Sequence, residues 1–77
     1  MGLFNRFKKT NDELEALVCG VENNASNNYK DAAQEDFRKF LAKFDELKNS
    51  GSLNEKQIAH YDEIKSRFEV ELKGFHH

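Results

Sequence analysis

A chain of 77 residues forms one small domain, and its single cysteine excludes a disulfide within the chain as a source of stability. The chain has no proline and only 4 glycines, and its wealth of Glu, Lys, Asp, Leu and Ala favours an all-α fold. The 7 phenylalanines, unusual in so polar a sequence, predict a packed core rather than a disordered chain.

Charge is distributed unevenly along the chain. The first ten residues carry a charge of +3 and the remainder a net charge of −5. Nucleic-acid binding needs a basic face, so this distribution argues against it. No apolar run approaches the roughly 20 residues that span a bilayer, and residues 1–9 lack the apolar core of a secretion signal. Together with the lone thiol, these features predict a cytoplasmic protein.

A first helix is predicted over about residues 11–23. The stretch TNDE supplies Thr10 as N-cap and Glu13 as its capping-box partner. Apolar residues then recur at helical spacing, at Leu14, Leu17, Val18, Val21 and Ala25. Gly20 lies inside this pattern and costs about 1 kcal/mol relative to alanine.

The polar run ENNASNN, residues 22–28, is the predicted break after this helix. Asparagine side chains compete for backbone hydrogen bonds and therefore favour caps and turns. The alternative is a single helix over residues 11–49, because the apolar phase is not clearly reset across the run.

Two further helices are predicted over about residues 28–49 and 54–73. The apolar stripe of the second consists of Ala33, Phe37, Phe40, Leu41, Phe44 and Leu47, and that of the third consists of Ile58, Tyr61, Ile64, Phe68 and Leu72. Between them, Gly51 suits the left-handed residue just after a helix. Asn54 then acts as N-cap with Gln57 as its box partner, and Leu53 is placed to pack on Ile58 as a hydrophobic staple.

The two stripes mirror each other about Ser52 and Leu53. In an antiparallel hairpin with its apex there, facing residues have numbers that sum to about 105. The apolar positions obey this rule at 47 and 58, 44 and 61, 41 and 64, 37 and 68, and 33 and 72. The sequence therefore predicts an all-α fold, a small three-helix bundle whose second and third helices form an antiparallel αα-hairpin, with the first helix as a third wall. Residues 10–77 form this single domain, and residues 1–9 precede it as a basic amphipathic segment.

No catalytic, cofactor-binding or metal-binding set stands out. Cys19 and His60, with His76 and His77 at the end of the chain, match no compact ligand spacing. We interpret Cys19 as a buried or half-buried inert thiol and His60 as a residue at the boundary of the core. Carboxylates are abundant at helical i,i+4 spacing from lysine or arginine, which is typical of a solvated helix face. We therefore predict a protein that is not an enzyme, with no cofactor and no small-molecule substrate.

The N-terminal stretch MGLFNRFKK is the most suggestive segment for a membrane surface. It combines the apolar residues Leu3, Phe4 and Phe7 with the basic residues Arg6, Lys8 and Lys9. Such a segment can lie at an anionic membrane surface. The alternative is that its apolar residues cover the end of the bundle while the basic ones stay in water.

The hairpin turn carries a resemblance to a known module. The stretch LKNSGSLNEKQI, residues 47–58, is similar to the turn of the SHOCT short C-terminal domain, and the likeness extends over residues 41–72. Asn54 stands where that family usually has threonine, and Phe40 and Phe44 stand where it prefers leucine. The resemblance implies an interaction or oligomerisation hairpin without chemistry. The opening MGLF with a nearby FKK also resembles small uncharacterised bacterial helical proteins.

These features predict a non-enzymatic interaction or assembly module that binds a protein partner or associates with itself. A small domain leaves much apolar surface near water, so pairing would increase its burial. We expect a partner helix beside Phe37, Phe40 and Phe68. The second hypothesis is a peripheral membrane protein that docks through residues 2–9.

Overall fold

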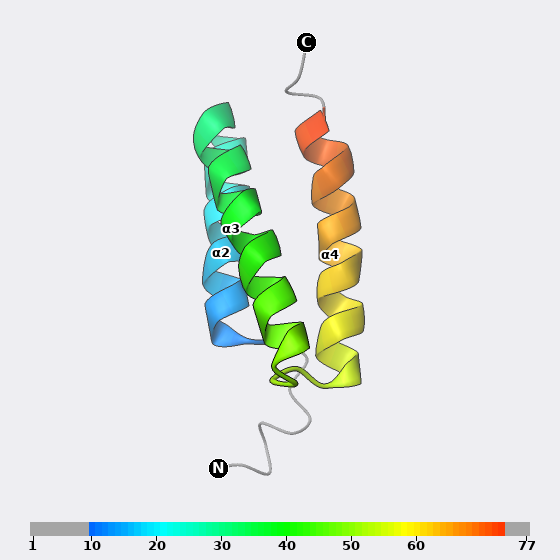
Figure 1. The fold of residues 1–77 in the computed structure, drawn as a ribbon. Coiled ribbons are helices and arrows are strands. Elements are labelled where there is room, and N and C mark those ends of the chain that lie inside the picture. Colours follow the sequence, from blue (N-terminus) through cyan, green and yellow to red (C-terminus); the bar gives the residue numbers. More distant parts are fainter. Residues whose placement is uncertain (1–9, 74–77) are drawn as a thin grey trace.

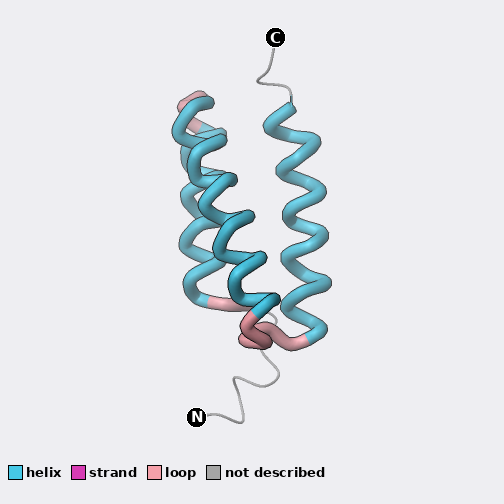
Figure 2. Tube along the Cα trace, viewed as in Figure 1, coloured by secondary structure: helices cyan, strands magenta, loops and turns pink. Residues whose placement is uncertain are grey.

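A computed structural model describes residues 10–73 of the chain. This part consists of helices α2 (Asp12–Ser26), α3 (Lys30–Asn49) and α4 (Glu55–Lys73), joined by short turns and without a strand (Figure 1). Figure 2 shows that turns occupy only the ends of the helices. The predicted all-α fold is confirmed.

The N-cap of helix α2 lies one residue later than predicted. Asn11, in extended conformation, is the N-cap, and its side-chain Oδ1 accepts a hydrogen bond from the Leu14 N–H at 3.1 Å. The predicted cap at Thr10 is therefore wrong. Asparagine is as good an N-cap as threonine, and only the position of the first turn decides between neighbouring candidates.

The chain turns at residues 27–29, so the alternative of one continuous helix is wrong. Asn28 adopts the left-handed conformation with φ of 64°. The Tyr29 N–H donates to the Asn24 carbonyl at 2.8 Å, and the Asn28 N–H donates to the Ala25 carbonyl at 3.1 Å. These two bonds form a Schellman ending, which satisfies carbonyls that the helix itself leaves free. Helix α2 runs to Ser26, three residues beyond its predicted end.

The turn between α3 and α4 repeats this ending. Gly51 has φ of 73°, as predicted, and its N–H donates to the Lys48 carbonyl at 3.1 Å while the Ser52 N–H donates to the Leu47 carbonyl at 3.0 Å. The predicted capping box of α4 is also present. The Gln57 N–H donates to Asn54 Oδ1 at 2.8 Å, and the Asn54 N–H donates back to Gln57 Oε1 at 2.9 Å.

The core lies between all three helices. Its buried apolar side chains are Leu14, Val18, Val21, Ala33, Phe40, Phe44, Leu53, Tyr61, Ile64, Phe68 and Leu72. Two of the mirrored pairs meet through their rings, with centroids 6.0 Å apart for Phe44 and Tyr61 and 5.9 Å apart for Phe37 and Phe68. The antiparallel hairpin of the second and third helices is thus as predicted, and α2 supplies the third wall.

Helices α2 and α3 pack more closely than α3 and α4. Gly20 explains part of this closeness, because a Cβ atom at this position would lie only 2.7 Å from Asp36 Oδ2. The same carboxylate oxygen accepts a hydrogen bond from Asn24 Nδ2 at 2.8 Å. Gly20, which lowers the helix propensity of α2, therefore makes room for the hydrogen bond between Asn24 of α2 and Asp36 of α3.

Within the part of the chain that the structure describes, no helix combines the length and the apolar character needed to cross a membrane.

Candidate functional site

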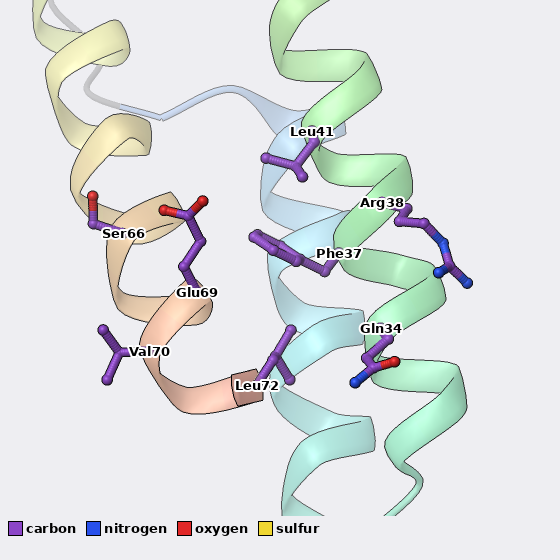
Figure 3. Close-up of a pocket in the computed structure, with 8 residues that line it drawn as sticks. All are labelled: Gln34, Phe37, Arg38, Leu41, Ser66, Glu69, Val70 and Leu72. Atoms are coloured by element: carbon purple, nitrogen blue, oxygen red, sulfur yellow. The ribbon is translucent and has the colours of Figure 1, made fainter. Parts of the chain in front are cut away.

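An open groove lies between α3 and α4 (Figure 3). It has a volume of about 730 Å³ and is lined by Gln34, Phe37, Arg38 and Leu41 of α3 and by Ser66, Glu69, Val70 and Leu72 of α4. No residue of α2 lines it, because α2 packs against the other side of α3. The groove is therefore a surface of the α3/α4 hairpin alone.

The groove is apolar along its length and polar at its edges. Phe37 points from α3 toward α4, with Leu41 above it in the view of Figure 3. Both side chains are half-buried, whereas Val70 on the opposite wall is 74% exposed. Arg38 points away from α4 at the outer edge of α3 (Figure 3). An exposed valine on one wall and half-buried aromatic and aliphatic side chains on the other leave apolar surface of the groove in water.

The three phenylalanines predicted to flank a partner site do come together. The ring centroid of Phe37 lies 6.2 Å from that of Phe40 and 5.9 Å from that of Phe68. The centroids of Phe40 and Phe68 lie 6.3 Å apart. Phe40 and Phe68 are core residues, however, with 0% and 1% of their surface exposed. Of the three, Phe37 lines the groove, and the other two support it from beneath.

Sequence reasoning missed Val70 as a groove residue. The residue lies outside the apolar stripe of α4, whose members are spaced by three or four residues up to Phe68 and Leu72. The position of Val70 outside the stripe was the signal that could have identified it, because an apolar residue off the core stripe of a polar helix does not face the core of the hairpin.

The end of the bundle away from the groove is closed by buried polar contacts. The Gln57 side chain is buried, and its Nε2 donates to the Thr10 carbonyl at 2.8 Å. The Tyr61 hydroxyl accepts from the Asn11 N–H at 2.8 Å and donates to Glu15 Oε2 at 2.7 Å. These contacts fasten α4 to the start of α2. Burial, with a further contribution from the Glu15 carboxylate, raises the pKa of the Tyr61 hydroxyl.

Ion pairs connect the helices at the surface. Lys43 of α3 lies 3.2 Å from Glu13 of α2 and 3.2 Å from Glu46, and these hydrogen-bonded carboxylates raise the pKa of its ammonium group. Arg67 of α4 lies 3.4 Å from Glu22 of α2. Exposed pairs of this kind contribute little stability.

Cys19 is exposed, which corrects its prediction as a buried or half-buried thiol. At about 100° per residue it lies more than 100° from the centre of the stripe formed by Leu14, Val18 and Val21, and the core does not extend so far around α2. His60 is half-buried, with its ring centroid 4.8 Å from that of Tyr61, at the predicted boundary of the core. Among residues 10–73, no group of three His, Cys, Asp or Glu side chains is placed to hold a metal ion.

The residues of the predicted membrane-contact segment, Leu3, Phe4, Arg6, Phe7, Lys8 and Lys9, lie outside the described residues, as do His76 and His77.

Comparison with protein-family models, with curated proteins and with solved structures finds no match to this chain. The resemblance of residues 41–72 to the SHOCT hairpin therefore stays a prediction.

Proposed function

We propose that this protein is a non-enzymatic interaction module and that the groove between α3 and α4 receives a helix of another polypeptide. The observation that carries the proposal is the apolar groove with Val70 74% exposed on its wall. Apolar surface of this kind gains free energy when a partner covers it, at about 25 cal/mol for each Å² removed from water.

The shape and lining of the groove favour a helical ligand. Two antiparallel helices side by side form a furrow along their axes, and an amphipathic helix can lay its apolar face into such a furrow with anchors at i, i+3, i+4 and i+7. The apolar floor at Phe37 and Leu41 suits such anchors. Gln34, Arg38, Ser66 and Glu69 at the edges offer the polar rim that protein interfaces usually have.

Selection from a display library of amphipathic helical peptides tests this proposal. We expect enriched peptides with apolar anchors at helical spacing, and we expect NMR shift changes on binding to concentrate at Phe37, Leu41 and Val70. Val70→Glu should weaken binding at least tenfold, whereas Ala16→Glu on the exposed surface of α2 should leave it unchanged. Equal enrichment on the wild-type chain and on Val70→Glu would contradict the proposal.

Docking on a membrane through residues 2–9 is the second candidate function, and the basic amphipathic sequence of this segment favours it. Co-sedimentation with vesicles that contain anionic lipid tests it. The full chain should bind and a chain without residues 2–9 should not, while equal recovery of both in the supernatant would contradict membrane docking. Both candidate functions agree with the cytoplasmic location predicted from the sequence.

A further inference from the structure

The two walls of the α3/α4 groove carry opposite charges. Arg38 stands on the α3 wall and Glu69 on the α4 wall, along the same stretch of the groove (Figure 3). Both residues are exposed. Between them lie the apolar side chains of Phe37 and Leu41, while Val70 lies on the outer side of α4, beyond Glu69 as seen from α3 (Figure 3). An apolar strip with a positive edge on one side and a negative edge on the other is complementary to a copy of itself.

We propose that the occupant of the groove is the same face of a second copy of this chain. This proposal rests on the proposed function of the groove as a docking site. The two copies are related by a two-fold axis parallel to the helices, so that α3 of each copy lies over α4 of the other. A rotation about this axis does not change the height of a residue along the bundle. Arg38 of each copy therefore lies beside Glu69 of the other, and Val70 of each copy covers the groove of the other.

The edge charges select this arrangement over the other two-fold one. An axis perpendicular to the helices would place α3 over α3 and α4 over α4. With this axis at the height of Arg38 and Glu69, Arg38 meets Arg38 and Glu69 meets Glu69, and with the axis at another height neither ion pair forms. Like charges brought together at an interface oppose association and suppress the wrong pairing. The parallel axis instead forms two ion pairs for each dimer, and it makes every pair of neighbouring helices antiparallel, as in a four-helix bundle.

The face is large enough for a specific dimer. Helices α3 and α4 have 20 and 19 residues, which corresponds to a length of about 30 Å. Two such helices about 10 Å apart present a face about 20 Å wide, or roughly 600 Å² in projection. Standard protein interfaces bury about 800 Å² of accessible surface on each partner, and accessible area exceeds projected area on a corrugated helical face.

Sedimentation equilibrium of the full chain at increasing concentration tests the proposal. The wild-type chain should show a monomer–dimer equilibrium. Arg38→Glu and Glu69→Arg should each weaken the dimer at least tenfold, because each substitution creates two like-charge contacts. A mixture of these two variants should form a heterodimer as tight as the wild-type dimer, since both ion pairs are then restored with reversed sign. Lys39→Glu, the same change of charge one residue along α3 but outside the groove, should leave the dimer unchanged.

The outcomes separate the dimer from the proposed function. A wild-type chain that stays monomeric at every concentration overturns self-association, while binding of the selected peptides in a manner dependent on Val70 would still support the groove as a docking site. A wild-type dimer that is insensitive to Val70→Glu overturns the use of this face. If Val70→Glu weakens the dimer but the mixture of Arg38→Glu and Glu69→Arg does not form a tight heterodimer, the face is correct and the proposed parallel two-fold axis is overturned. Circular dichroism of each variant verifies that it retains the wild-type helix content.

Discussion

Helix α3 belongs to two hairpins, and the two are packed in different ways. On the α2 side, Gly20 lets the Asp36 carboxylate lie against the facing helix, and the helices approach closely. On the α4 side, aromatic rings fill the space between the helices, with the Phe40 centroid 6.0 Å from that of Tyr61 and 6.3 Å from that of Phe68. Small residues at an interface bring helix axes together, whereas rings hold them apart.

The two turns share a helix ending but differ in length, since residues 27–29 join α2 to α3 and residues 50–54 join α3 to α4. Both hairpins begin with the same Schellman ending, with Asn28 at the left-handed position in the first and Gly51 in the second. The size of the side chains between the helices, together with the longer turn before α4, sets how closely each pair packs. On the side of the α3/α4 hairpin that α2 does not cover, helices α3 and α4 form the two walls of the groove. The candidate site is therefore a consequence of the aromatic packing between these two helices.

The largest effect is expected from removal of the Phe40 ring, which contacts the rings of Phe37, Phe44, Tyr61 and Phe68. Phe40 is 0% exposed, so Phe40→Ala should lower the free energy of unfolding by about 3–5 kcal/mol through lost burial and a cavity. Phe37→Ala should cost less, because this ring is half-buried at the groove. Urea denaturation followed by circular dichroism measures both. An equal loss would show that Phe37 carries as much of the fold as Phe40.

The hydroxyl of Tyr61 links the α3/α4 hairpin to the start of α2. Tyr61→Phe keeps the ring but removes the bonds to Asn11 and Glu15, and it should lower the free energy of unfolding by about 1–3 kcal/mol. Urea denaturation near neutral pH measures this loss. An unchanged stability would mean that water replaces the hydroxyl without cost.

Tyr61 also predicts a dependence of stability on pH. Its pKa is raised by folding, so its contribution is fully present below the ordinary tyrosine pKa of about 10 and is lost as pH rises above it. The raised pKa of Lys43 acts with the same sign in the same alkaline range. The fall in stability above about pH 10 should be shallower in Tyr61→Phe than in the wild-type chain. Parallel curves would exclude Tyr61 as its source.

The turns can be compared through their left-handed residues. At Gly51 an added Cβ meets no atom within 4 Å, so Gly51→Ala isolates the backbone cost, which should be about 1–2 kcal/mol. Asn28→Gly should act in the opposite direction and raise the free energy of unfolding by about 0.5 kcal/mol. Thermal unfolding of both variants tests whether the two endings obey the same conformational rule.

The smallest effect is expected at Gly20. Alanine should gain about 1 kcal/mol in helix propensity, but its methyl group displaces the Asp36 carboxylate from Asn24, so Gly20→Ala alone should be close to neutral. In an Asp36→Ala background the gain should appear in full. A double-mutant cycle measures the difference, and additive effects would show that Gly20 and Asp36 are not coupled.

The local features of the fold follow from the sequence because each depends on residues a few positions apart. The apolar stripe of each helix, the Asn54–Gln57 box and the left-handed Gly51 are all of this kind. The start of α2 shows the limit of such reasoning, since Thr10 and Asn11 are both good caps and neighbouring contacts select Asn11.

Tertiary structure decided what depends on a third element. The position of α2 against the hairpin decided three features. These are the exposure of Cys19, the close approach of Asp36 at Gly20 and the partial exposure of Phe37 beside the buried Phe40 and Phe68. Sequence periodicity gives the direction of a side chain relative to its own helix but not what covers that direction. The sequence by itself therefore determined the helices and their pairing about the turn, and only the packing of α2 on one side of α3 left the other side as a groove.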